Sequence, residues 1–335
     1  MKLKHLFIYI LAVLFVFPLT ATFAQNGLTI DVIATFDYPG TGNQTRPQKI
    51  TDSGDIVGIY VDSSGVSRGF IRSVKGNFSA PIVEPNDTGN FTEARGINDA
   101  RTVCGDYVGS DGAFHGFFLS GGIFTEFNVA DSTSTEVLGI NNFGDFAGGF
   151  TPTSTGITQA FVSIGGSITP IDILGSTASF AYQLNASNRY CGYYSDSASI
   201  NHGFYLDKNG TLQFPIDPAG STGTILFGLN NSDWIVGRYS DSAGVTHGLV
   251  FIAPNHFITF DYPGSTFTSL NGINRAGFIC GRYTDSSGID HGILARATRT
   301  FGNEAGHEMK ATSPALPVRA TSPSSSALPS KGPAS

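Results

Sequence analysis

The chain has 335 residues, of which only 13% are Asp, Glu, Lys or Arg, whereas glycine (42) and phenylalanine (27) are abundant. This composition favours short strands joined by tight turns over helices. The formal net charge of −7, without basic clusters, argues against a partner such as nucleic acid or an anionic membrane surface.

The first segment predicts export. Lys2 and Lys4 precede an apolar run over residues 6–19, and Thr22-Phe23-Ala24 places small residues where a signal peptidase reads them. We therefore expect a signal peptide over residues 1–24, cleaved before Gln25, rather than a membrane span. Its removal leaves 17 Lys and Arg against 26 Asp and Glu, a net charge of −9. The mature protein is expected to be secreted, either extracellular or periplasmic.

A repeat follows, with the signature I-N-x-x-G-x-x-x-G-x-Y-x-D-x-x-G-x-x-H-G-F. Its six copies are 43 to 47 residues apart and open at Ile50, Ile97, Ile140, Leu184, Leu229 and Ile273. A unit this short cannot bury its own apolar face, so the copies must stack or close into a ring.

Each copy predicts four strands. In the fifth copy, these are residues 224–229, 234–239, 247–252 and 257–261, separated by turns rich in Asn, Asp, Gly and Pro. Four short antiparallel strands in one repeat are typical of a β-propeller blade.

The two ends of the array predict that the ring closes. The sixth copy stops after its third strand, near Arg296, and residues 33–40 match residues 257–264, which end the fifth copy, almost one for one. We therefore predict an all-β, six-bladed propeller of four-stranded blades over residues 27–298, in which the N-terminal strand completes the last blade and removes two exposed sheet edges. The remaining residues, 299–335, are rich in Pro, Ser and Ala and predict a disordered tail.

The repeat carries a resemblance to a known family. Its Gly-Ile-Asn-x-x-Gly opening, Asp-Ser-x-Gly turn, His-Gly-Phe triplet and Phe-Asp-Tyr-Pro-Gly strand end resemble the HAF family of extracellular repeat proteins over residues 30–296. The third copy departs from the pattern, with Gln159-Ala160-Phe161 in place of His-Gly-Phe. The resemblance implies a secreted bacterial protein with a β-propeller-like fold and brings no particular reaction.

Several polar residues recur at fixed repeat positions and are interpreted as structural. The histidines at one such position are His115, His202, His247 and His291. We expect each to hydrogen-bond within its own blade, to a turn aspartate, because side chains related by rotation converge on a metal only near the axis. The Asp-x-x-Gly turns start at Asp62, Asp241 and Asp285. Each loop offers one carboxylate, too few for calcium, so we expect neither a metal nor a cofactor.

Two further sets of residues share a repeat position. The three cysteines, Cys104, Cys191 and Cys280, fall in different blades, too far apart for the Cα limit of roughly 7 Å that a disulfide requires, and are expected in the core as free thiols. The recurring asparagines are expected to form turns, and they are Asn98, Asn141, Asn185, Asn230 and Asn274.

Ligand binding is expected on the face that carries the Asp-Ser-x-Gly hairpins and the loops after the fourth strands, around the axial opening. The candidates there are Tyr38, Tyr262, Asp37 and Asp261. The alternative is that both tyrosines only brace their Pro-Gly turns. We name the hairpin-bearing side of the ring the loop face.

Two classes of function fit the sequence. The first is a secreted monomeric module that binds an extracellular glycan or protein, and the second is a hydrolase or lyase acting on a polysaccharide or a lactone. A glycosidase needs a facing pair of carboxylates, and the glutamates of the propeller are few and uneven: Glu84, Glu93, Glu126 and Glu136. The single Gly-x-Ser-x-Gly sequence, at residues 65–69, falls on the Asp-Ser-x-Gly turn and third strand of the repeat and is therefore not interpreted as a hydrolase elbow, and no His-Glu-x-x-His motif occurs. These observations favour binding, whereas a carboxylate in the central channel that breaks the six-fold pattern would favour an enzyme.

Overall fold

The computed structural model of the protein describes residues 22–25, 27–40, 42 and 44–299. The expected signal peptide, apart from residues 22–24, and the expected tail, apart from Arg299, lie outside the described residues. Within the described part of the chain, a search for helices long and apolar enough to cross a membrane finds none.

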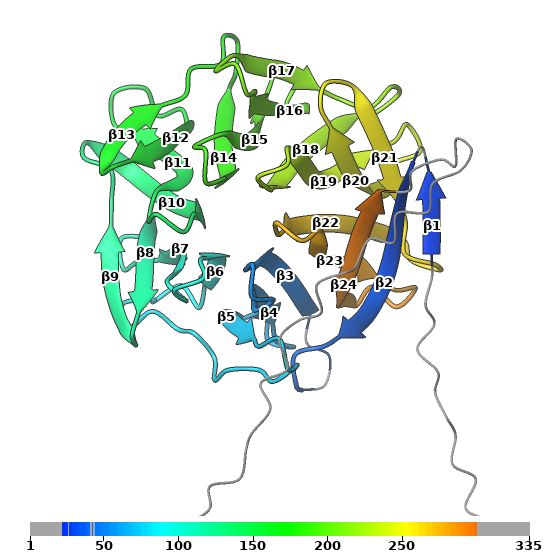
Figure 1. Cartoon of the computed structure of the whole chain (residues 1–335). Helices are drawn as coiled ribbons and strands as arrows, with labels where there is room; N and C mark the ends of the chain where they lie inside the picture. The colour runs from blue at the N-terminus through cyan, green and yellow to red at the C-terminus, as the bar shows by residue number, and fades with distance from the viewer. Residues whose placement is uncertain (1–21, 26, 41, 43, 300–335) are drawn as a thin grey trace, which may run out of the picture. The chain divides into compact units, whose positions relative to one another are not determined.

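Residues 28–299 form a β-propeller of six blades around an axis (Figure 1). The innermost strands are β3 (Gln44–Ile50), β6 (Thr92–Ile97), β10 (Ser132–Ile140), β14 (Ala178–Leu184), β18 (Gly223–Leu229) and β22 (Phe267–Ile273). The second strands are β4 (Ile56–Val61), β7 (Val103–Val108), β11 (Phe146–Pro152), β15 (Tyr190–Ser195), β19 (Trp234–Ser240) and β23 (Phe278–Thr284). The third strands are β5 (Ser67–Arg72), β8 (Phe114–Ser120), β12 (Gln159–Ile164), β16 (Asn201–Leu206), β20 (Thr246–Ile252) and β24 (Asp290–Arg299). The outermost strands are β9 (Ile123–Phe127), β13 (Ser167–Pro170), β17 (Leu212–Ile216), β21 (His256–Phe260) and β2 (Leu28–Phe36).

The predicted fold is confirmed, and the first blade departs from it in one detail. In place of a fourth strand, the segment after β5 makes two isolated antiparallel bridges to β5, Arg72 with Phe78 and Gly69 with Ile82. Pro81 lies between them and has no N–H to donate to a ladder, which interrupts regular pairing.

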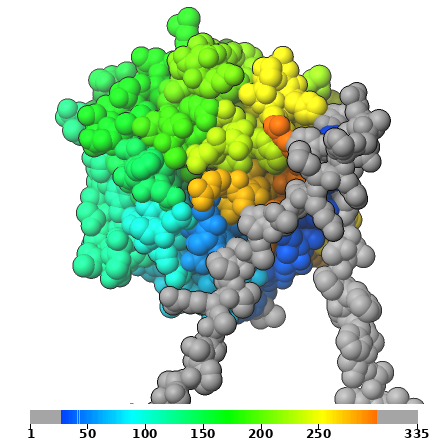
Figure 2. All heavy atoms as spheres, viewed as in Figure 1, coloured from blue at the N-terminus to red at the C-terminus, as the bar shows by residue number. Residues whose placement is uncertain are grey.

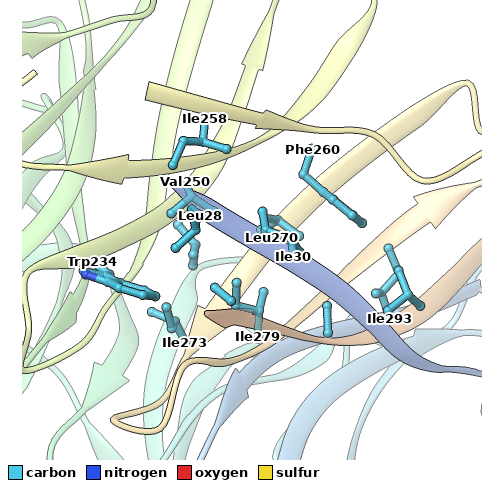
Figure 3. Close-up of a cluster of buried hydrophobic side chains, with 14 residues drawn as sticks. Leu28, Ile30, Trp234, Val250, Ile258, Phe260, Leu270, Ile273, Ile279 and Ile293 are labelled. Carbon is cyan, nitrogen blue, oxygen red and sulfur yellow. The ribbon is translucent and has the colours of Figure 1, made fainter. Parts of the chain in front are cut away.

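The N-terminal strand closes the ring as predicted. β2 pairs antiparallel with β24, with Phe36 opposite Gly292 and Leu28 opposite Arg299, and β1 (Thr22–Gln25) pairs with the outer edge of β2. Figure 3 shows Leu28 and Ile30 of β2 inside a cluster of apolar side chains from the fifth and sixth blades, with Ile293 of β24 beside them. In Figure 2, atoms of the first blade (blue) meet those of the last (orange). The closing strand is therefore held by both backbone pairing and burial of apolar side chains.

The repeat's second-strand glycine has a packing role. A Cβ at Gly58 would lie 2.6 Å from the ring of Phe70, and one at Gly192 would lie 2.8 Å from the ring of Phe204. These phenylalanines, from the Gly-Phe end of the signature, are fully buried. Glycine at this position therefore lets a third-strand aromatic ring lie across the second strand.

The recurring asparagines join neighbouring blades. Each Oδ1 accepts backbone N–H groups of its own turn, as the Asn274 Oδ1 does from Ala276 and Phe278 at 3.0 and 2.9 Å. Each Nδ2 also donates to the backbone oxygen at the same position of the next blade, and the donors are Asn98, Asn141, Asn185, Asn230 and Asn274. The last of these bonds ends on Thr51 of the first blade, so this asparagine belt runs from the second blade round to the first.

Candidate functional site

Near the axis of the ring, three positions of the repeat carry different types of residue in different copies. Counting from the opening Ile or Leu of each copy, position −4 holds Arg46, Glu93, Glu136, Phe180, Ile225 and Ser269. Position −2 holds Gln48, Arg95, Leu138, Tyr182, Phe227 and Asn271. Position +9, which follows the second-strand glycine, holds Ile59, Asp106, Gly149, Tyr193, Arg238 and Arg282.

A cavity of about 180 Å³ lies on the axis and is lined only from these three positions. We call it the axial cavity, and its lining residues are Arg46, Gln48, Ile59, Glu93, Arg95, Tyr182, Phe227, Arg238, Asn271 and Arg282. It lies toward the beginning of the innermost strands, which is the side of the loop face. At the other end of the axis, the turns of the asparagine belt surround a smaller hollow of about 80 Å³.

A β-bulge in each innermost strand positions this lining. The pairing with the second strand shifts by one residue at position −2 in all six blades. A bulge leaves its extra residue out of the ladder and redirects that side chain. The bulge residues of five blades line the axial cavity, whereas Leu138 of the third blade does not. The residue at this position is different in each of the six blades.

Arginines of the fifth, sixth and first blades form one wall of the axial cavity. Arg46 and Arg282 share the carboxylate of Asp290, with Nε–Oδ2 and Nη1–Oδ2 distances of 2.7 and 2.9 Å. Arg238 lies between two aromatic rings, with its guanidinium carbon 5.3 Å from the Phe227 centroid and 5.4 Å from the Phe267 centroid. Burial lowers the pKa of Arg238, and it lowers the pKa of Arg282 to about 10.

An acidic cluster lies on the opposite side, around Arg95. The Arg95 guanidinium bonds to Glu93 and, through Nε at 3.0 Å, to the Oδ1 of Asp106. Asp106 is fully buried, and its Oδ2 has no partner among the described residues. Burial raises the pKa of Asp106 to about 6 and that of Glu136, in the next blade, to about 8. Of these three carboxylates, only Glu93 lines the cavity.

Lys49 separates the axial cavity from the hollow beneath it. Its Nζ reaches across the ring and donates to the backbone oxygens of Phe227 and Asn271, at 2.5 and 3.2 Å. Four of the other five blades have glycine at this position, and a Cβ at Gly272 would lie 2.8 Å from the Cα of Lys49. The innermost strands thus approach closely here, and the lysine is 5% exposed. Burial lowers its pKa to about 8.

The recurring histidines lie away from the axis, each in a network within its blade. His291 has Nδ1 2.8 Å from Asp37 and Nε2 3.4 Å from Asp285, and its ring stacks on Tyr283 at 4.9 Å. His202 and His247 have the same pattern, with Asp196 and Asp217 for the first and Asp241 and Asp261 for the second; His115 lies against Asp111 and Asn128. Where histidine is missing, Arg68 bonds to Asp62 at 2.8 Å and Gln159 bonds to Asp172. Among the described residues, no group of three or more His, Cys, Asp or Glu side chains could hold a metal ion.

The four residues predicted to bind ligand are not in the axial cavity. Tyr38 stacks on Tyr60 with ring centroids 3.9 Å apart, and Tyr262 stacks on Tyr283 at 3.8 Å. Asp37 and Asp261 are the carboxylate partners of His291 and His247. Asp261 and Tyr262 also line a separate surface hollow of about 370 Å³ between the fifth and sixth blades, which we call the inter-blade hollow.

The three cysteines are free and buried. Burial raises the pKa of the Cys191 and Cys280 thiols to about 12, so they are protonated at neutral pH.

Sequence reasoning missed most of the axial cavity, although it singled out Glu93 and Glu136 as uneven. The signal was present as the three positions at which the copies disagree. At these positions the copies carry charged, polar, aromatic and aliphatic residues, so the blade does not require one particular side chain there, and the bulge places position −2 on the axis.

Comparison with known proteins found no matching family model and no match among curated proteins. Solved structures with a similar fold include a lectin from Aleuria aurantia, a mutant form in complex with Fucα1-6GlcNAc (13% identity, TM-score 0.45, covering 73% of this chain and 89% of the lectin). The lectin BP39L from Burkholderia pseudomallei has 11% identity and a TM-score of 0.46, covering 83% and 93%. The β-propeller domain of the Trilobed protease from Pyrococcus furiosus has 8% identity and a TM-score of 0.45, covering 86% and 99%. At such identities, the ligands of those proteins do not transfer to this chain.

Proposed function

We propose that this protein is a secreted binding module that takes a sugar unit of an extracellular glycan into the axial cavity. The observation that carries the proposal is the lining itself: guanidinium, amide and carboxylate groups beside the rings of Tyr182 and Phe227, all on non-repeating positions. Sugars are recognised by such a combination of directional polar groups and apolar ring faces.

The size of the cavity favours a glycan over a protein partner. A volume of about 180 Å³ is that of about six water molecules, which suits one sugar unit or the end of a chain. A stable protein partner would instead cover about 800 Å² of this surface.

The proposal is tested by screening the chain from residue 25 onward against an array of extracellular glycans. The variant Gln48→Leu removes an amide from the cavity wall, and Gln213→Leu makes the same change on the outer strand β17. We expect the first to weaken glycan binding at least tenfold and the second to leave it unchanged.

Two results would contradict the proposal. One is the absence of binding to every glycan at millimolar concentration. The other is wild-type binding by Gln48→Leu together with loss of binding in Tyr262→Ala, which would move the site to the inter-blade hollow and support the prediction made from the sequence for Tyr262.

A second candidate is cleavage of a polysaccharide in the same cavity. It is favoured by Glu93, an off-pattern carboxylate on the axis, and by the raised pKa of Glu136 nearby in the acidic cluster. It is disfavoured because Glu93 is paired with Arg95 and no second carboxylate lines the cavity in the described residues. Release of reducing ends or unsaturated sugars from a bound polysaccharide, abolished in Glu93→Gln, would establish this activity in place of simple binding.

A further inference from the structure

The arginines around the axial cavity are paired with enough carboxylates on one side of the cavity but not on the other. On one side, Arg95 is matched by Glu93 and Asp106. On the other side, Arg46 and Arg282 share the single carboxylate of Asp290. The wall formed by the fifth, sixth and first blades therefore carries an excess of positive charge in a chain that is acidic overall.

Arg238 is the clearest part of this excess. Its guanidinium is part-buried between two phenylalanine rings, lines the cavity, and makes no salt bridge with any described residue. Removing a guanidinium from water without a matching anion is costly, and the rings supply only part of the compensation. The lowered pKa of Arg238 has the same cause, because the effect of burial outweighs the opposing effects of Tyr182, Tyr193 and Asp290.

The scaffold does not require this arginine. At the same position the other blades have isoleucine, aspartate, glycine, tyrosine and arginine, so the strand accepts side chains of every class there. Arg282 occupies the position in the adjacent sixth blade, where it lines the same cavity. Two guanidinium groups on neighbouring blades thus line the same axial cavity.

We infer that the glycan bound in the axial cavity is acidic, and that its anionic group is held by Arg238 and Arg282. This inference rests on the proposed function and specifies its ligand. The guanidinium fork matches the paired oxygens of a uronic acid carboxylate or of a sulfate ester. Gln48 also lines the cavity, and its Oε1, which accepts no hydrogen bond from a described residue, can accept one from a hydroxyl group of the sugar.

Calorimetry with three oligosaccharides of equal length tests the inference: an oligogalacturonate, a sulfated galactan fragment and a neutral galactan fragment. We expect at least one acidic oligosaccharide to bind ten times more tightly than the neutral one, with an affinity that falls as salt is added. The two acidic arms distinguish a carboxylate from a sulfate ester as the bound group.

The matched variants are Arg238→Gln in the cavity and Arg275→Gln at the opposite end of the axis, where the arginine side chain is 72% exposed. We expect Arg238→Gln to weaken binding of the acidic sugar about ten times more than binding of the neutral one, so that the preference is lost. Arg238→Lys should retain part of the preference, and Arg275→Gln all of it. If Arg238→Gln does not fold, the wild-type comparison and its salt dependence decide the question.

The outcomes separate the two proposals. Equal affinity for the acidic and neutral sugars, or a preference unchanged in Arg238→Gln, overturns the acidic ligand and leaves glycan binding intact. Absence of binding to all three oligosaccharides and to the wider array overturns both.

Discussion

Asn274 of the last blade donates its Nδ2 proton to the backbone oxygen of Thr51 in the first blade, at 3.0 Å and across 223 residues of sequence. This bond completes the asparagine belt at the point where the two ends of the array meet. Between the innermost strands of the same two blades, the Nδ2 of Asn271 in β22 donates to the backbone oxygen of Pro47 in β3 at 2.7 Å. The ring is therefore closed by inner-strand hydrogen bonds as well as by the outer pairing of β2 with β24.

The belt bond at this junction predicts the effect of Asn274→Asp. The carboxylate keeps the oxygen that accepts the two turn N–H groups but replaces the Nδ2 donor with a charged oxygen facing the Thr51 oxygen. We expect a loss of about 1–3 kcal/mol in the free energy of unfolding, measured by denaturant titration. Asn255→Asp, in an exposed turn, is the control and should change stability by less than about 0.5 kcal/mol. Equal effects of the two substitutions would show that the belt adds nothing to stability.

The closing strand predicts a difference between two alanine variants. Ile30 is 1% exposed and Ile33, on the same strand, is 43% exposed. Ile30→Ala should lower the free energy of unfolding by about 2–5 kcal/mol because it leaves a cavity in the cluster of Figure 3. Ile33→Ala should cost under about 1 kcal/mol. Similar small losses for both would mean that β2 is not required to hold the ring.

Lys49 predicts a pH effect on stability. Its pKa is lowered by burial from 10.5 to about 8 in the folded protein, so between these pH values the unfolded chain holds a proton that the native state has released. Lys49 therefore adds a contribution to the free energy of unfolding that increases with pH between pH 8 and about 10.5. Lys49→Met should lack this component, which is measured as the difference between the two proteins in urea titrations. Parallel pH profiles over that range would contradict the buried position of the ammonium.

The histidine networks predict the opposite trend at lower pH. Burial lowers the pKa of His291, but the hydrogen bonds and charges of Asp37 and then Asp285 outweigh it, so the pKa is raised above 6.5. A raised pKa contributes stability that is complete below pH 6.5 and is lost as the pH rises through the folded-state value.

His291→Gln imitates Gln159 of the third blade, which bonds to Asp172, and should remove this component without breaking the blade. The measurement is unfolding free energy between pH 5 and 8, where the advantage of the wild type over the variant should shrink as the pH rises. An advantage that stays constant, or grows, would contradict the prediction.

Much of the fold could be predicted because the same pattern of strands and turns recurs in six copies of the repeat. In the fifth blade, the predicted strand 247–252 is β20 (Thr246–Ile252) and the predicted strand 257–261 is β21 (His256–Phe260), each within one residue. The match between residues 33–40 and 257–264 predicted the pairing of β2 with β24, because identical side chains at equivalent positions bury against equivalent neighbours. The candidate site was less predictable. The turn role assigned to the asparagines accounts for their Oδ1 atoms, whereas the Nδ2 partners lie in the next blade.

The sequence by itself determined the blade, the number of blades and the way the ring closes, since these follow from local patterning copied along the chain. Only the tertiary structure decided what lies on the axis. Regular alternation does not predict a bulge at position −2, and it does not show that Arg238, Arg282 and Glu93 share one cavity. Their meeting depends on rotation around a closed ring, which brings together residues from blades far apart in sequence, and no pattern within one repeat contains that information.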